Sequence, residues 1–172
     1  MYGKTSDKDF EWVKYLKECL DSTLVGVLAT AGGNGAWVTP VYFSYDDRFN
    51  FYFISSPGTR HMIDIEKDDR VALAIVSHPS VAGIHQIGMQ LSGRASEVSD
   101  KEIESVYALR SKRMAFDQSW VPLPNGGHYV KEHGGIFMRI SPVAINYFDS
   151  RFFGGESKKV PLDKIGGKKG LI

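Results

Sequence analysis

The stretch that decides the fold is 24–56, LVGVLATAGGNGAWVTPVYFSYDDRFNFYFISS, which consists of three apolar runs separated by two short turns. The runs are rich in β-branched and aromatic residues. The turns AGGNG (31–35) and DDRFN (46–50) carry the glycine, asparagine and aspartate that tight hairpins need. Pro40 cannot donate a ladder hydrogen bond, so the middle strand should contain an irregularity or lie at a sheet edge. These features predict an antiparallel β-meander.

Three later runs also have strand character: RVALAIVS at 70–77, IHQIGMQLSGRASEVS at 84–99 and IFMRISPVAINYF at 136–148. Gly88 and Gly93 permit bulges in the second of them. Apolar spacing and capping residues predict helices at 6–20, at 59–66 and after the Ser99 and Glu102 pair. About six strands with two or three peripheral helices predict a mainly β fold, a small closed or nearly closed antiparallel barrel.

Two segments give weaker signals. Residues 116–135 are rich in proline, glycine and aromatic residues, and we expect an ordered loop or lid there. This loop contains Trp120, which either covers a planar ligand or only seals a subunit interface. The tail at 154–172 is rich in glycine and lysine, and this composition does not predict whether the tail is ordered.

Length and composition predict one domain over 1–172, with the barrel at about 24–150. Twenty-one Lys and Arg against twenty Asp and Glu leave a net charge of +1, so no overall field attracts nucleic acid or an anionic membrane. Cys19 is the only cysteine, which excludes a disulfide within the chain and a cysteine-based zinc site. No apolar run approaches the roughly 20 residues that span a bilayer. We therefore expect a cytoplasmic protein.

Polar residues gather at one turn between two apolar runs: Ser55, Ser56, Thr59, Arg60 and His61. Backbone N–H groups at the start of the 59–66 helix, three hydroxyls and a guanidinium are the components of an anion site, and phosphate is its natural ligand. The local alternative is that Thr59 or Ser56 simply caps a short helix while Arg60 and His61 are solvated.

The order of these pieces resembles the pyridoxamine 5′-phosphate oxidase-like, FMN-binding split-barrel superfamily. The likeness runs from about Leu24 to Val98 and rests on the TPV strand with its acidic hairpin, the Ser/Thr-Arg-basic turn and the polar residue before SGRA. The resemblance implies a six-stranded antiparallel split barrel that forms homodimers and binds FMN in grooves at the subunit interface.

Position by position, the resemblance implies that backbone groups around Thr39 and Val41 face the flavin ring, and that Gln90 hydrogen-bonds it. The phosphate end would lie against a second group of residues: Ser55, Ser56, Thr59, Arg60 and His61. His61 stands where many relatives have lysine. The Arg-rich strand motif and the C-terminal Arg-Leu-His-Asp-Arg segment of the authentic oxidases are replaced by VTPVYF and FDSRFFGG. We therefore expect a substrate other than pyridoxamine phosphate.

The remaining motifs predict no catalytic side chain and no metal site. The five histidines never form a helical His-x-x-x-His pair and have no cysteine partner, which argues against zinc. His128 and His133 lie in the 116–135 segment, and a loop histidine can ligate haem iron, as in some split-barrel relatives. The resemblance therefore implies an FMN-dependent oxidoreductase acting on a small molecule. The alternatives are a non-catalytic flavin- or haem-binding protein, a deazaflavin in place of FMN, and a degenerate site without cofactor.

Overall fold

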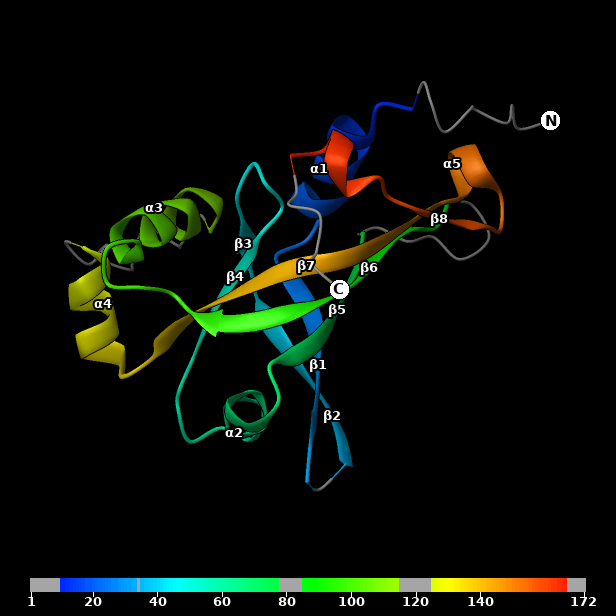
Figure 1. Ribbon diagram of the computed structural model, residues 1–172. Coiled ribbons are helices and arrows are strands. Elements are labelled where there is room, and N and C mark those ends of the chain that lie inside the picture. Colours follow the sequence, from blue (N-terminus) through cyan, green and yellow to red (C-terminus); the bar gives the residue numbers. More distant parts are fainter. Residues whose placement is uncertain (1–9, 34, 78–84, 115–124, 167–172) are drawn as a thin grey trace.

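The computed structural model describes residues 10–33, 35–77, 85–114 and 125–166 (Figure 1). Their elements, in chain order, are α1 (Trp12–Asp21), β1 (Val25–Gly32), β2 (Gly35–Tyr42), β3 (Ser44–Tyr45), β4 (Phe51–Ser55), α2 (Arg60–Lys67), β5 (Arg70–Val76), β6 (Ile87–Glu97), α3 (Ile103–Arg113), α4 (Gly126–His133), β7 (Ile136–Asp149), α5 (Ser150–Phe153), β8 (Ser157–Lys159) and the 3-10 helix η1 (Leu162–Lys164).

The described strands form one antiparallel sheet in the order β2-β1-β5-β6-β7-β4-β3, with β8 added beside β7. The sheet curls, so that β6 and β7 run across β1 and β4 (Figure 1). This arrangement confirms the predicted mainly β split barrel. The described sheet has eight strands instead of six because β3 and β8, of two and three residues, add to the six longer ones.

Strand alternation sends one side chain in two into the core. Leu28, Leu73 and Met89 on neighbouring strands are each no more than 1% exposed, and Leu16 and Leu20 of α1 cover one end of this core. β2 is a terminal strand of the sheet, as Pro40 predicts. The predicted irregularity in β6 is a register shift between Ser92 and Gly93, where a Cβ on Gly93 would lie 2.5 Å from the Ser141 carbonyl oxygen.

The helix predicted at 6–20 begins later than expected. Phe10 and Glu11 are not helical, and the Ser6–Asp9 capping pair lies outside the described residues. The Phe10 ring packs 4.7 Å from the Trp12 ring and 4.9 Å from the Phe153 ring, measured between centroids. Aromatic packing therefore directs the chain into the core before the first helical turn.

The structure describes part of each of the two less regular segments. Residues 126–133, predicted as part of a loop, form helix α4, which Asn125 caps by accepting a 2.7 Å hydrogen bond from the His128 amide. Trp120 lies outside the described residues. The described part of the tail is ordered: β8 pairs with β7, and Val160 and Ile165 are only 2% and 3% exposed.

Candidate functional site

The predicted turn lies between the end of β4 and the start of α2, as expected for a helix at 59–66. Ser55 is the last residue of β4, Thr59 is the N-cap residue of α2, and His61 is in its first turn. The Ser55 hydroxyl lies 2.7 Å from His61 Nε2 and 3.2 Å from the Thr59 hydroxyl, which is itself 3.2 Å from Nε2. The three side chains therefore form one hydrogen-bonded cluster.

His61 is buried, with 8% of its surface exposed. Burial lowers the pKa of its imidazole below 6.5, and the nearby Asp64 carboxylate opposes that change only in part. The ring is consequently neutral at physiological pH and offers one N–H donor.

Thr59 does not cap α2 with its side chain. Its hydroxyl donates instead to the Ser56 carbonyl oxygen at 2.9 Å, and the Thr59 amide donates to the same oxygen at 3.1 Å. The first N–H groups of the helix are therefore not capped by this hydroxyl, and they carry the positive end of the helix dipole. The alternative of a side-chain cap with a solvated histidine is wrong.

Arg60 is held against the edge strand by residues that the sequence reasoning did not single out for this role. Its guanidinium carbon lies 4.4 Å from the centroid of the Trp37 ring, and Nε lies 3.9 Å from Asp64 Oδ2. Thr30 of β1 donates a 3.1 Å hydrogen bond to the same carboxylate oxygen. The i,i+4 spacing of Arg60 and Asp64 is visible in the sequence, but their meeting with Trp37 depends on the pairing of β1 with β2.

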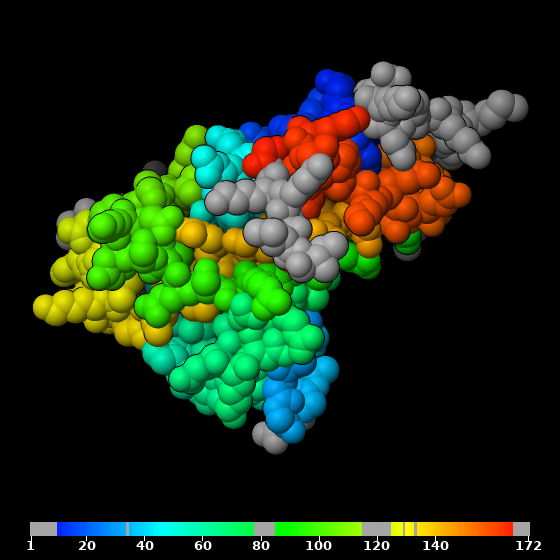
Figure 2. Space-filling model, in the orientation of Figure 1, coloured from blue at the N-terminus to red at the C-terminus, as the bar shows by residue number. Residues whose placement is uncertain are grey.

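α2 and the β1–β2 hairpin lie side by side at one end of the molecule (Figure 2). Thr39 and Val41 alternate with Pro40 on β2, and pair with Leu28 and Gly26 of β1. Val41 is 8% exposed, so a ligand would meet the backbone of this terminal strand more readily than the Val41 side chain. Ser56 is exposed in the turn itself.

Gln90 lies on the opposite face of the sheet. It pairs with Ala74 of β5 and Asn146 of β7, and its neighbours Met89 and Leu91 point into the core. It lines a surface hollow of about 460 Å³ with Ala74 and Asn146. A single chain therefore brings Ser55, Thr59 and His61 together, with Arg60 beside them, and places Gln90 elsewhere.

Two further observations bear on the kind of site. Among the described residues, no three His, Cys, Asp or Glu side chains are grouped closely enough to hold a metal ion. None of the described helices is both long enough and apolar enough to cross a lipid bilayer.

Comparison with known proteins gives one family and several similar folds. The family model of pyridoxamine 5′-phosphate oxidase matches residues 13–126. No curated protein matches the chain. A haem-binding protein from Mycobacterium smegmatis has a TM-score of 0.69 at 15% identity over 95% of this chain, which spans only 61% of that protein.

Two other solved structures are similar over most of their length. An FAD-binding protein from Mesorhizobium loti has a TM-score of 0.59 and 21% identity, covering 81% of this chain and 95% of that one. The haem storage protein HutZ from Vibrio cholerae has a TM-score of 0.56 and 18% identity, covering 74% and 87%. At these identities the structures support the fold alone. Because the family model matches well over half of the residues of this chain, the chain belongs to the pyridoxamine 5′-phosphate oxidase-like split-barrel superfamily.

Proposed function

We propose that two copies of this chain bind FMN between them and that the protein is a flavin-dependent oxidoreductase acting on a small molecule. The observation that carries the proposal is the Ser55, Thr59 and His61 cluster at the start of α2, with Arg60 beside it. Hydroxyls, an imidazole N–H, helix amides and a guanidinium are the donors that a phosphate monoester requires.

The residues present fit the phosphate end of FMN. The stacking of Arg60 on Trp37 and its proximity to Asp64 restrict a long side chain before the ligand arrives, which lowers the entropic cost of binding. His61 is neutral in the free protein, and a phosphate dianion beside it would favour the protonated ring.

The flavin ring end requires a second copy. An outer apolar face, which we define as Val25, Val27, Val38, Tyr42 and Val76, spans neighbouring strands β2, β1 and β5, and its members are 38–63% exposed. Gln90 lies on this same side of the sheet, next to Ala74, the partner of Val27. We infer that a second copy covers the outer apolar face, since contiguous exposed apolar surface of this kind marks interaction sites. Gln90 of one copy would then meet the turn of the other.

Bound flavin would supply the hydride or electron transfer, while this chain would orient it and exclude water. No side chain in the described site is required as an acid or base. We further propose a substrate other than pyridoxamine phosphate. VTPVYF contains no arginine, and FDSRFFGG contains only Arg151, which pairs with Asp149 and Glu18, where the authentic oxidases have an Arg-Leu-His-Asp-Arg segment.

The test is a pair of titrations with FMN and riboflavin, followed by flavin fluorescence and absorbance. If the turn holds the phosphate, FMN binds at least about tenfold more tightly than riboflavin, the value of one charged hydrogen bond. A nicotinamide donor should then bleach the bound flavin if the protein is a reductase. Equal affinities for FMN and riboflavin would remove the phosphate assignment, and no binding of either would point to a degenerate site.

Haem is the second candidate ligand, because two of the similar structures are a haem-binding and a haem storage protein. In this chain His128 of α4 is part-exposed, with Nε2 3.8 Å from Glu132 Oε1, so an imidazole is accessible there. A haem titration that produces a shifted Soret band, lost in His128→Ala, would favour the non-catalytic haem alternative over the flavin enzyme.

A further inference from the structure

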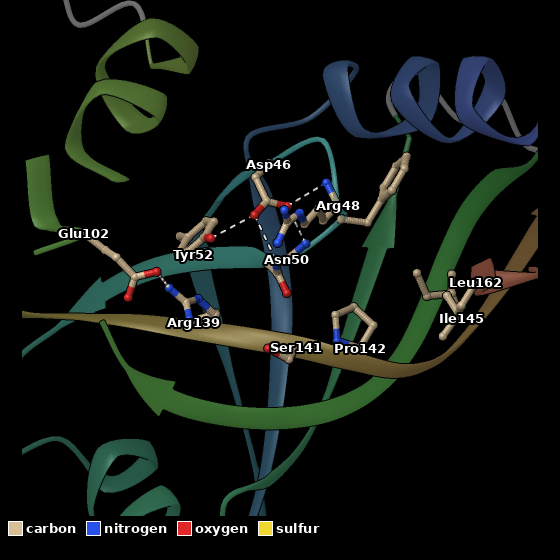
Figure 3. Close-up of a pocket in the computed structure, with 11 residues that line it drawn as sticks. Asp46, Arg48, Asn50, Tyr52, Glu102, Arg139, Ser141, Pro142, Ile145 and Leu162 are labelled. Carbon is tan, nitrogen blue, oxygen red and sulfur yellow. Dashed lines mark hydrogen bonds and ion pairs between the residues drawn. The ribbon is translucent and has the colours of Figure 1, made fainter. Parts of the chain in front are cut away.

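A second pocket lies away from the turn at residues 55–61, between the β3–β4 hairpin and β7 (Figure 3). It has a volume of about 220 Å³. Asp46, Asn50 and Tyr52 lie on the hairpin side, and Arg139 and Ser141 lie across from them on β7. Tyr52 pairs with Arg139, whereas Ser55 pairs with Ile136 three residues further along, so the two sites lie at opposite ends of β4.

The acidic groups of this pocket are already engaged. Asp46 accepts four hydrogen bonds of 2.8–2.9 Å, from the Arg48 and Asn50 amides, the Asn50 side chain and the Tyr52 hydroxyl. Glu102 accepts from Arg139 with one oxygen and from Ser99 with the other. The carboxylates therefore have little capacity left for a cationic ligand.

The unused capacity of the pocket consists of donors. Arg139 lines the pocket with a side chain that is 23% exposed, and it donates to the Glu102 carboxylate through Nη2. The Arg48 guanidinium lines the same pocket and forms no ion pair with any described side chain. A ligand that satisfies this site must bring acceptor oxygens.

The other end of the pocket is apolar. Pro142 of β7 and Leu162 of the tail supply its apolar surface (Figure 3), while the lining residues Ile145 and Phe49 are no more than 1% exposed. Phe49 has φ 59°, a left-handed conformation that a bulky residue seldom adopts, and the turn that contains it is fixed by the four bonds to Asp46. Strained backbone conformations of this kind cluster at active sites and ligand sites.

We propose that this pocket binds a small carboxylate with an apolar tail. The carboxylate oxygens accept hydrogen bonds from the Arg139 and Arg48 guanidinium groups, and the tail lies against Pro142 and Leu162. A guanidinium matches a carboxylate in both charge and geometry, and a volume of about 220 Å³ has room for a small ligand of this kind.

The test uses hexanoate as the probe and its neutral amide, hexanamide, as the matched control, with binding followed by amide chemical shifts of the protein without flavin. We expect saturable binding of hexanoate with a Kd of about 1 mM or tighter, with shifts centred on residues 46–52 and 139–142. Hexanamide should bind about tenfold more weakly, since it cannot form the charge-assisted bonds.

The decisive variant is Arg48→Ala, because Arg48 is exposed and only its backbone supports the turn, so the protein should fold. We expect it to weaken hexanoate binding about tenfold, whereas Arg70→Ala should leave it unchanged, because Arg70 is exposed, pairs with Asp68 and is not among the residues that line the pocket. The proposal fails if hexanoate shows no saturable shifts up to about 20 mM, if hexanamide binds equally well, or if Arg48→Ala has no effect.

Discussion

At the scale of single residues, the guanidinium of Arg60 lies between an aromatic ring and a buried carboxylate, 4.4 Å from the Trp37 centroid and 3.9 Å from Asp64 Oδ2. Such a position fixes the direction of its N–H donors. The identities of the turn residues could be predicted from the sequence. The contacts that hold Arg60 could not be predicted, because Trp37 and Asp64 are brought together only by strand register and helix packing.

Arg60→Ala should weaken FMN binding by roughly 10- to 100-fold, the range for loss of a charged hydrogen bond, while riboflavin binding changes little. Isothermal titration of both ligands measures the difference. Arg70→Ala serves as the matched control, since that arginine is exposed and pairs with Asp68 away from the turn. The same loss of affinity for riboflavin would mean that Arg60 does not contact the phosphate.

His61 should make the stability of the free protein depend on pH. Its folded-state pKa lies below 6.5 because the ring is buried, so above pH 6.5 the ring is neutral in both the folded and the unfolded chain. As the pH falls through 6.5, the unfolded chain takes up the proton first. The free energy of unfolding therefore decreases until the folded-state ring is also protonated.

Urea unfolding at pH 7.5 and 5.5 checks this, with His61→Gln as the comparison because glutamine can still donate to Ser55. The variant should lose less stability between the two pH values than the parent protein. An identical loss in both proteins would show that His61 is not responsible.

At the scale of elements, α2 packs on β1 through a contact that requires glycine at position 32. Asp64 of α2 packs so closely on Gly32 that a Cβ there would lie 1.8 Å from Asp64 Oδ1. Gly33, the next residue, has nothing within 4 Å of its Cβ position. The two glycines are therefore a matched pair for testing how α2 is positioned.

Gly32→Ala should displace Asp64 and destabilise the protein by about 1–3 kcal/mol, as other overpacking substitutions do, and it should also weaken FMN binding through Arg60. Gly33→Ala should change stability by no more than about 0.5 kcal/mol. Chemical denaturation of both variants provides the measurement. Equal stabilities would contradict the seating of α2 that we describe.

Most element types could be predicted from the sequence, because β1, β2, β4 and β5 are apolar runs bounded by turn residues. The exceptions have physical causes. Helix α4 follows Asn125 and begins with two glycines, a composition that is typical of a turn. The helix depends on its Asn125 cap and on its packing against α3, which the local sequence does not show. β8 is only three residues long and is held by pairing with β7, a contact distant in sequence.

At the scale of the whole molecule, the strand order follows from pairings between distant segments, such as β4 with β7, which local patterns do not contain. The superfamily resemblance predicted the split barrel, and the family match confirms it. Gln90 lies on the side of the outer apolar face, opposite the face that receives α2, and for this reason we propose that a second copy completes the site.

Val27→Asp should convert the proposed dimer to a monomer and abolish tight FMN binding, because a carboxylate would be buried at the centre of the outer apolar face. Val13→Asp is the control, since Val13 on α1 is 40% exposed against 45% for Val27 and lies outside that face. Sedimentation velocity reports the mass of each variant. A Val27→Asp protein that keeps both its dimer and its FMN affinity would exclude this face as the interface.

The most direct measurement is an FMN titration of mixed dimers made from Arg60→Ala and Gln90→Glu chains, each of which should bind FMN weakly as a homodimer. If each site combines Arg60 of one copy with Gln90 of the other, a mixed dimer contains one unaltered site, and half of the wild-type capacity returns at wild-type affinity. If mixing restores no site of wild-type affinity, the cofactor is not held between two copies in the way we describe.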